Sequence, residues 1–251
     1  MSSAGLKLQF EHMNNCLNIS NLTVHLHGRR ILSNVSLAVN RGEFAVVLGD
    51  NGAGKTTLLR SILGLIPATS GIIGLFGQQA SWRNRRALRR RIGYVPQTLA
   101  FDETMPVSVR DVIAIGRCAR AGLGHRLNSN DWALVDRAAH DAGIFHLLAR
   151  PIGQLSGGER QKVQIARAMC QQPDLLLLDE FSSHLSTTAR QDCLQLLERL
   201  HLQERFAVLM ITHHASAVPA NCQRTIVLAG GQKQFDGDRH DWQAMRKGGQ
   251  P

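Results

Sequence analysis

One segment constrains the fold of this 251-residue chain more than any other: Gly49-Asp50-Asn51-Gly52-Ala53-Gly54-Lys55-Thr56-Thr57. It follows the apolar run 44–48, which predicts a buried strand, and precedes the run 58–63, which predicts a helix. Glycines at such a turn let backbone N–H groups approach an anion, and the start of the helix adds partial positive charge. The segment matches the Walker A pattern, in which the lysine reaches the β- and γ-phosphates and the next hydroxyl binds Mg²⁺. We therefore predict a nucleotide site at Lys55 and Thr56, because a simple strand-to-helix turn leaves the lysine unexplained.

Strands and helices alternate along most of the chain. Before the glycine-rich segment, the runs 17–26 and 31–39 alternate as strands do and predict a small antiparallel β region. After it, we expect a strand at 72–76 and a short strand at 92–97. The pattern is helical from 107 to about 149, so we expect an all-helical insert there, with Asp131 as a helix start.

The second half of the chain continues the alternation. Helices are predicted at 160–172 and 188–200, buried strands at 175–178 and 206–211, and a last strand at 226–228. Polar groups follow several of these strands. This arrangement predicts an α/β P-loop NTPase core with a doubly wound, mostly parallel sheet, to which the antiparallel β region and an all-helical subdomain are added.

Three polar side chains stand where predicted strands end. Asp179 follows four leucines, as in a Walker B element whose carboxylate supports Mg²⁺. Glu180 is placed to polarise water for attack on the γ-phosphate, and His213 can hydrogen-bond that phosphate. Each also has a simpler interpretation, because a strand-end acid pair can cap a helix and a single histidine can be structural.

A further motif, Leu155-Ser156-Gly157-Gly158-Glu159, lies directly before a predicted helix and forms a second anion site of backbone amides and a hydroxyl. With these motifs in this order, the sequence resembles the nucleotide-binding subunits of ABC transporters. The resemblance covers residues 17–240 as a single cassette, with the helical subdomain at about 98–165. It leaves an N-terminal extension at 1–16 and a C-terminal tail at 241–251.

The resemblance implies an active ATPase that uses ATP and Mg²⁺. Glu180 matches the catalytic base and His213 the switch histidine, and both act with Lys55 in catalysis. Gln97 matches the glutamine that contacts Mg²⁺ and couples to membrane subunits, so the implied metal ligands are Thr56, Gln97 and Asp179. The implied nucleotide contacts are Gly49, Asp50, Asn51, Gly52, Ala53, Gly54, Lys55, Thr56, Thr57, Gln97, Ser156, Gly157, Gly158, Glu159 and Asp179.

Three positions depart from the family's pattern. The place of the aromatic residue that stacks on adenine holds Leu26 or His27, which predicts weaker or different base stacking. Phe181 stands where a proline usually follows the catalytic glutamate, and Ser186 replaces an aspartate in a loop at the dimer interface. Ser186 and Phe181 keep open the alternative of a regulatory cassette that binds ATP without efficient turnover.

The segment 102–113, followed by Gly116-Arg117, is similar to bacterial importers of metal ions and of metal chelates such as siderophores and cobalamin. The resemblance implies membrane-embedded permease subunits, a substrate-binding protein and a head-to-tail homodimer in which Ser-Gly-Gly closes over the partner's ATP. It places the protein in the cytoplasm, on the inner face of the membrane. Transport of another substrate and a non-transport role on nucleic acid stay open as alternatives.

The chain has a net charge of +10 and a sequence pI near 10.3, which indicates a polyanionic neighbour. Much of this charge lies in the arginine-rich run 82–91, which lacks interleaved aromatic residues and any nucleic-acid-binding motif. We interpret the run as the solvated face of a helix that precedes a strand, and we do not expect nucleic acid as a partner. Proximity to membrane headgroups stays open.

Two further absences limit the class of protein. No apolar run approaches the ~20 residues that span a bilayer, and residues 1–16 lack the apolar core of a signal peptide. The cysteines form no C-x-x-C pair, which argues against a zinc site and a disulfide framework and predicts reduced thiols at Cys16, Cys118, Cys170, Cys193 and Cys222.

Overall fold

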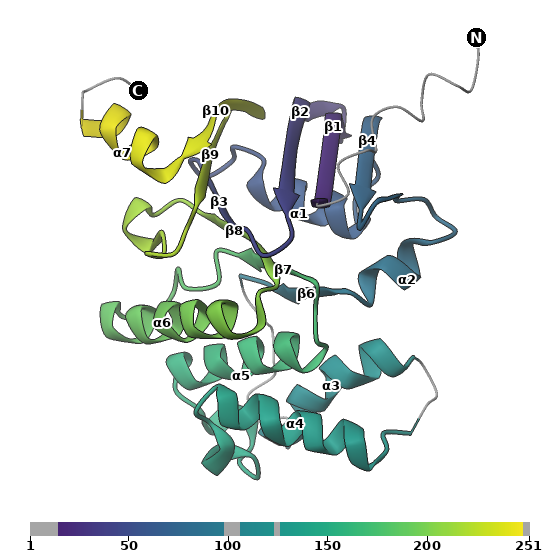
Figure 1. Ribbon diagram of the computed structural model, residues 1–251, viewed down its shortest axis with the longest axis vertical. Coiled ribbons are helices and arrows are strands. Elements are labelled where there is room, and N and C mark those ends of the chain that lie inside the picture. Colours follow the sequence, from purple (N-terminus) through teal and green to yellow (C-terminus); the bar gives the residue numbers. More distant parts are fainter. Residues whose placement is uncertain (1–14, 98–105, 123–125, 248–251) are drawn as a thin grey trace. The chain divides into compact units, whose positions relative to one another are not determined.

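The computed structural model describes residues 15–97, 106–122 and 126–247 (Figure 1). By their contacts, the residues form two compact units. The first unit contains the described residues up to Arg89, with Ala207–Ala215 and the described residues from Cys222 onward. The second unit contains the described residues of Arg90–Phe206, with Ser216–Asn221. The expected extension at 1–16 lies almost wholly outside the described residues. Residues 102–105, the start of the segment 102–113 that is similar to metal importers, also lie outside them.

Four strands of the first unit form an antiparallel sheet in the order β2-β1-β4-β5, with bounds β1 Asn15–Leu26, β2 Arg29–Asn40, β4 Ser70–Leu75 and β5 Gln78–Gln79. Leu17, Ile19, Leu22 and Val24 of β1 are buried. The side-chain alternation that predicted these strands therefore corresponds to one covered face, with register shifts where β1 is irregular. The predicted antiparallel β region is confirmed.

The other four strands of this unit pair in the order β10-β9-β3-β8, with bounds β3 Phe44–Leu48, β8 Ala207–Thr212, β9 Arg224–Ala229 and β10 Gln232–Asp238. β3 runs parallel to both of its neighbours, and β10 is antiparallel to β9. Every residue of β3 and β8 is buried, as expected for strands covered on both faces. Helix α1, Lys55–Leu63, follows β3 after the glycine-rich turn.

The expectation that residues 226–228 form the last strand is wrong, because β10 follows, and after it helix α7, Arg239–Lys247. β10 has no apolar alternation that could reveal it in the sequence. It pairs with β9, and ion pairs support this pairing: Arg224 Nε lies 2.6 Å from Asp236 Oδ1, and Lys233 Nζ lies 2.7 Å from Asp236 Oδ2. Burial acts to raise the pKa of Asp236, but the hydrogen bonds and ion pairs with Arg224 and Lys233 together outweigh it and keep the pKa below its usual range.

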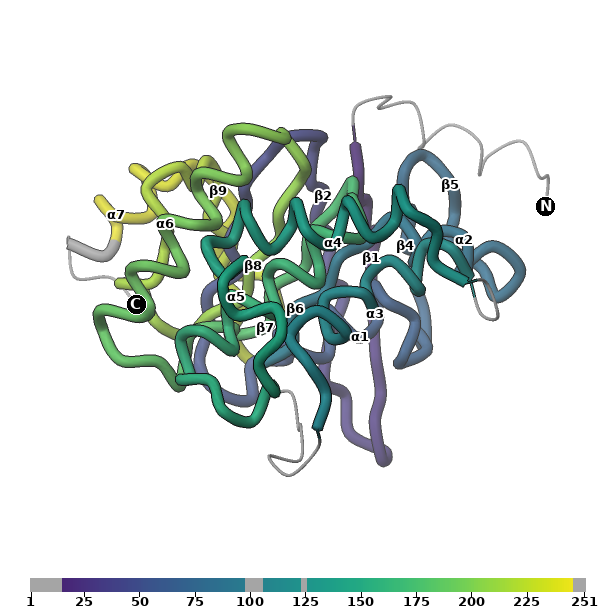
Figure 2. Tube along the Cα trace, turned by 90° about the horizontal axis from the view of Figure 1, so that it is seen from below, coloured from purple at the N-terminus to yellow at the C-terminus, as the bar shows by residue number. Residues whose placement is uncertain are grey.

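The second unit joins two parallel strands to a set of helices. Its elements are β6 Ile92–Val95, α3 Val109–Ala121, α4 Ser129–Asp141, α5 Gly157–Cys170, β7 Leu175–Asp179 and α6 Thr187–Glu204. Helices α3, α4 and α5 pack against one another, as Figures 1 and 2 both show. Gly116 lets α3 approach α5, because a Cβ there would lie 2.1 Å from the Arg167 carbonyl oxygen. The predicted helical region is confirmed.

Helix α4 begins two residues before the predicted start at Asp131. Asn128 is its N-cap and accepts a hydrogen bond from the Asp131 N–H, while the Asp131 carboxylate accepts one from the Asn128 N–H, both at 3.0 Å. Asp131 is therefore the third helical residue of a capping box. The hydrogen bond from Asn128, followed by that from Arg117, lowers the pKa of Asp131.

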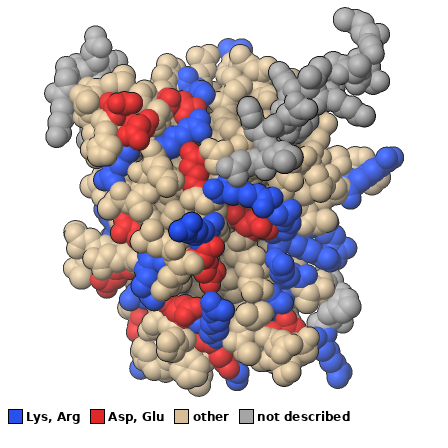
Figure 3. All heavy atoms as spheres, in the orientation of Figure 1, with Lys and Arg blue, Asp and Glu red and all other residues tan. Residues whose placement is uncertain are grey.

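The arginine-rich run forms the short helix α2, Arg85–Arg89, and precedes β6 in the chain as predicted. Arg86 and Arg89 are exposed, whereas Arg85 Nη1 donates to the Ser61 carbonyl oxygen at 3.2 Å. On the face drawn in Figure 3, Lys and Arg side chains gather in the region where Figure 1 places α2. None of the helices in the described ranges has both the length and the apolar content to cross a bilayer.

Helix α6 offers a matched test of the packing. We expect Leu197→Ala, at a fully buried position, to lower the free energy of unfolding by about 2–5 kcal/mol, because it leaves a cavity. Leu202→Ala removes the same atoms from a side chain that is 67% exposed, and it should change stability by less than about 0.5 kcal/mol. Urea unfolding measures both. Equal losses in the two variants would contradict the burial of this helix.

Candidate nucleotide-binding site

The glycine-rich turn of the first unit connects β3 to α1 and has the geometry of an anion cradle. Gly52 and Gly54 have φ angles of 84° and 97°, in the left-handed region that glycine adopts without strain. Gly49 is required for a different reason, because a Cβ there would lie 2.1 Å from the Leu228 carbonyl oxygen of β9. Gly54 is the N-cap of α1 and contributes no side chain, so the N–H groups of the first turn face the loop without a capping carboxylate.

Lys55 lies in this loop and is 4% exposed. Its Nζ donates to the carbonyl oxygens of Gly49 at 2.8 Å and Asp50 at 3.0 Å. The ammonium group is thus held against the turn that the sequence predicts as the phosphate site. Thr56 and Thr57 follow in the first turn of α1 and are half-buried.

His213 lies at the same edge of the sheet as the glycine-rich turn. Thr212, the last residue of β8, pairs with Leu48, the last residue of β3, so His213 and Gly49 leave neighbouring strands at the same level. The His213 and His214 rings have their centroids 3.8 Å apart and tilted by 43°. The His214 N–H donates to Thr212 Oγ1 at 3.1 Å, which ties the backbone after β8.

In the second unit, the end of β7 carries the two predicted carboxylates. Asp179 is 2% exposed and Glu180 is 8% exposed. Gln97 Nε2 donates to Glu180 Oε2 at 3.4 Å, so two predicted site residues that are far apart in the sequence are in contact. Glu180 has a φ of 42°, a left-handed conformation that is strained for a residue with a Cβ and often accompanies functional sites.

Sequence reasoning missed Tyr94, whose hydroxyl donates to Asp179 Oδ2 at 3.2 Å. Tyr94 lies on β6, directly beside β7, and pairs with Leu177. The sequence placed Tyr94 in a predicted strand at 92–97, but it did not show which strand pairs with it. The contact therefore depends on the pairing of β6 with β7.

Within the described ranges, no group of three or more His, Cys, Asp and Glu side chains could hold a metal ion by itself. Mg²⁺ does not need such a group, because it commonly binds through one or two carboxylates together with phosphate oxygens and water. Asp179, at the end of β7, is a buried carboxylate of the kind that this chemistry uses.

The second predicted anion motif lies at the start of α5. Ser156 is its N-cap, and the Ser156 N–H donates to Glu159 Oε2 at 2.8 Å. Hydrogen bonds from Ser156 lower the pKa of Glu159. The Glu159 carboxylate therefore forms a capping box with Ser156. The sequence predicted Glu159 only as a nucleotide contact and did not predict this role. A Cβ on Gly158 would lie 3.1 Å from Ala189 Cβ of α6, so the motif lies close to the start of that helix.

The three departures from the family's pattern have different environments. Ser186 is the N-cap of α6 and accepts a hydrogen bond from the Ala189 N–H at 3.4 Å, a role that an aspartate also performs. Phe181 is 2% exposed and packs in the interior. His27 is exposed, with a φ of 49°, in the turn between β1 and β2, and Leu26 precedes it at the end of β1.

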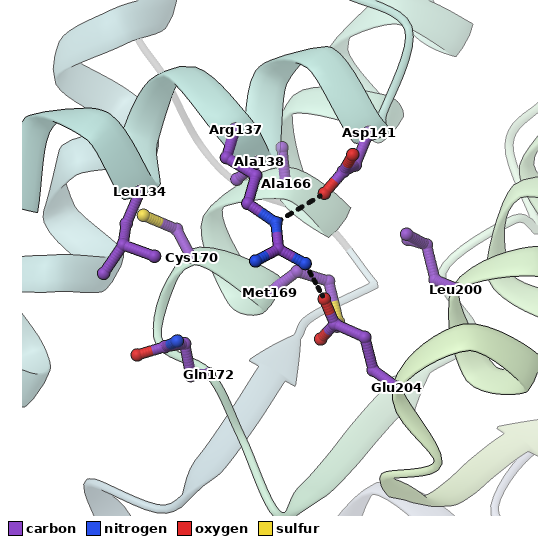
Figure 4. A pocket seen from close by; sticks show the side chains of 10 residues that line it. All are labelled: Leu134, Arg137, Ala138, Asp141, Ala166, Met169, Cys170, Gln172, Leu200 and Glu204. Atoms are coloured by element: carbon purple, nitrogen blue, oxygen red, sulfur yellow. Dashed lines mark hydrogen bonds and ion pairs between the residues drawn. The ribbon is translucent and has the colours of Figure 1, made fainter.

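The second unit also contains a hollow among α4, α5 and α6 with about 430 Å³ of atom-free space, part of it open to solvent (Figure 4). Arg137 crosses it, with ion pairs of 3.5 Å to Asp141 and to Glu204. Cys170 in its wall is buried, which raises the pKa of the thiol to about 12. The described residues that line the hollow are not those predicted to bind nucleotide, so it is a separate feature.

Comparison with known proteins shows similarity to ATP-binding proteins of transporters. The family described as "ABC transporter" matches residues 32–183. The chain is 34% identical over 233 residues to the zinc uptake system ATP-binding protein ZurA of Listeria innocua, covering 92% of this chain and 89% of the relative. It is 36% identical over 196 residues to the manganese transport system ATP-binding protein MntB of Bacillus subtilis, covering 78% and 76%. The solved structure of cbiO1 from Clostridium perfringens, part of the ABC transporter complex cbiONQ, superposes with a TM-score of 0.82 at 26% identity, covering 93% and 92%.

The chain therefore belongs to the ABC transporter family. It is the ATP-binding ATPase subunit of an importer whose complex includes membrane subunits. The predicted fold class is confirmed as the ABC ATPase fold, with its mostly parallel sheet, antiparallel β region and helical region.

The strained backbone at Glu180 gives a test in which stability and activity separate. We expect Glu180→Gly to leave the free energy of unfolding unchanged or to raise it by up to about 1 kcal/mol. Glycine adopts the left-handed φ without strain, but it also increases the conformational entropy of the unfolded chain, and the two effects oppose each other. ATP hydrolysis should be lost.

Arg205→Gly is the matched control, because Arg205 has a φ of 52° at the end of α6. It should gain similar stability and keep hydrolysis. Denaturant unfolding with an ATPase assay measures both variants, and a loss of more than about 1 kcal/mol in Glu180→Gly would contradict the assignment of strain.

Proposed function

We propose that this subunit hydrolyses ATP to power the import of a transition-metal ion, zinc or manganese, through its partner membrane subunits. The observation that carries the proposal is the likeness to ZurA and MntB, whose names state zinc uptake and manganese transport, over most of the length of all three chains. The similarity of segment 102–113 to metal-ion and metal-chelate importers points the same way, although 102–105 lie outside the described residues.

In the proposed mechanism, the glycine-rich turn and the first turn of α1 bind the phosphates of ATP. The Lys55 ammonium exchanges the carbonyl oxygens of Gly49 and Asp50 for β- and γ-phosphate oxygens. His213, at the same sheet edge, hydrogen-bonds the γ-phosphate and, with Lys55, stabilises the charge that develops on it.

The carboxylates of β7 act on the metal and on the water. Asp179, Gln97 and Thr56 are the residues that would hold Mg²⁺, and the ion would neutralise phosphate charge. Glu180 orients the attacking water and accepts its proton, and the 3.4 Å hydrogen bond from Gln97 keeps its carboxylate in place before ATP binds. Gln97 thereby touches the catalytic base and also stands directly before the segment that leads into the helical region.

We further propose a head-to-tail homodimer in which Ser156, Gly157 and Gly158 of one copy close over the ATP held by the other. The start of α5 supports this, because its capping serine and two glycines lie at a helix N-terminus suited to an anion. This subunit lies on the cytoplasmic face of the membrane, and membrane-embedded permease subunits and a substrate-binding protein complete the complex.

Two substitutions separate binding from chemistry. We expect Lys55→Ala to weaken ATP binding at least tenfold, because the phosphates lose their cation. Glu180→Gln should bind ATP normally and form a closed dimer, while turnover falls by about 10²–10⁴-fold.

Glu204→Gln, in the ion pair at the hollow, is the matched control and should behave as wild type. Isothermal titration and ATPase assays, with and without the permease, measure these variants. Undiminished turnover in Glu180→Gln would overturn its role as the base, and tight ATP binding without turnover in wild type plus permease would favour the regulatory alternative.

The transported substrate requires the whole complex. In proteoliposomes with the permease and the binding protein, we expect ATP hydrolysis to rise several-fold when the binding protein carries Zn²⁺ or Mn²⁺. Uptake of the radioactive metal should depend on ATP and vanish in Glu180→Gln. Stimulation by a siderophore or cobalamin, but by neither ion, would move the assignment to a metal-chelate importer.

A further inference from the structure

Tyr94 reaches the buried carboxylate of β7 from the neighbouring strand. Its hydroxyl donates to Asp179 Oδ2 at 3.2 Å. In the parallel pairing of β6 with β7, Tyr94 stands opposite Leu177, and Leu177 and Asp179 point to the same face of β7. The phenol ring can therefore run along that face and end at the carboxylate.

The backbone of Tyr94 is itself held by α5. Arg167 Nη2 donates to the Tyr94 carbonyl oxygen at 3.0 Å. The preceding Gly93 permits close packing, because a Cβ there would lie 3.2 Å from the Ala168 carbonyl oxygen and 2.9 Å from Leu176 Cδ1. A ring anchored at its backbone and at its hydroxyl has little freedom to turn, so the hydrogen bond constrains the orientation of Asp179.

We propose that Tyr94 is a positioning residue that orients the Asp179 carboxylate to bind Mg²⁺. The inference rests on the proposed function, in which Asp179 is a metal ligand. A carboxylate ligand held by a neighbouring hydrogen bond presents its oxygen to the metal without first losing rotational freedom, and removal of such a partner costs about 10–100-fold in metal affinity or activity. Arg167 acts one step further away, through the Tyr94 carbonyl oxygen.

The first experiment is a Mg²⁺ titration of ATP hydrolysis by the full chain with its permease. Tyr94→Phe keeps the ring and removes only the hydroxyl. We expect the Mg²⁺ concentration for half-maximal activity to rise about tenfold, with turnover at saturating Mg²⁺ within about twofold of wild type. ATP binding in EDTA should not change.

A matched pair at the two ends of β7 controls for the loss of a carboxylate. Asp179→Asn removes the proposed ligand and should abolish the response to Mg²⁺. Asp174→Asn makes the same chemical change directly before β7, where Asp174 Oδ2 accepts from Arg91 Nε at 2.7 Å, and should leave the Mg²⁺ requirement unchanged.

The second experiment reads the contact without relying on activity. Tyr94 is the only tyrosine of the chain, so incorporation of 3-fluorotyrosine gives one ¹⁹F resonance. With ATP present, added Mg²⁺ should shift this resonance in wild type and in Asp174→Asn but leave it in place in Asp179→Asn. Mn²⁺ should broaden it in the same two proteins.

The outcomes separate the two proposals. If Asp179→Asn loses the Mg²⁺ response while Tyr94→Phe keeps the wild-type requirement, the positioning role is overturned and the role of Asp179 stands. If Mg²⁺ changes neither the resonance nor hydrolysis in wild type, both roles are overturned. If Tyr94→Phe is less stable than wild type by thermal unfolding, the fluorine experiment decides instead. A Mg²⁺-dependent shift that wild type shows and Asp179→Asn lacks supports the positioning role, and the absence of a shift in wild type overturns it.

Discussion

The parallel pairing of β3 with β8 and β9 is the constraint on which the nucleotide site of the first unit depends. It sets the level at which β3 ends, and therefore the place where the backbone must turn into α1. The turn passes so close to β9 that only glycine fits at position 49. The same pairing brings His213 out of β8 beside the turn. Strand register thus positions the backbone N–H groups of the turn before any side chain contributes, and Lys55, held against the turn, then supplies a cation.

In the second unit, the pairing of β6 with β7 has the corresponding effect. It places Tyr94 along the face that ends in Asp179, and the segment after β6 carries Gln97 to Glu180. Burial alone would penalise these carboxylates, so the hydrogen bonds from Tyr94 and Gln97 also compensate for lost water. The strained Glu180 directly follows β7, which is buried throughout, and strain of this kind persists only where the surrounding structure maintains it.

Side-chain caps at helix N-termini recur in this molecule. Ser156 with Glu159, and Asn128 with Asp131, form reciprocal capping boxes, and Ser186 caps α6. The first turn of α1 lacks such a carboxylate, which leaves its N–H groups for an anionic ligand. The departure at Ser186 preserves the cap, so α6 keeps its start although the family's aspartate is absent.

The sequence by itself determined the features that depend on short spacing. The glycine-rich turn, the apolar runs of β3, β7 and β8 and the Ser-Gly-Gly helix start are local patterns, and together they were enough for the family and the fold class. Only the tertiary structure decided the contacts of Tyr94 and Gln97 with the β7 carboxylates, the left-handed backbone at Glu180 and the existence of β10. These features depend on strand register and on charges brought together by pairing, such as Arg224 with Asp236, and neither leaves a periodic signal in the sequence.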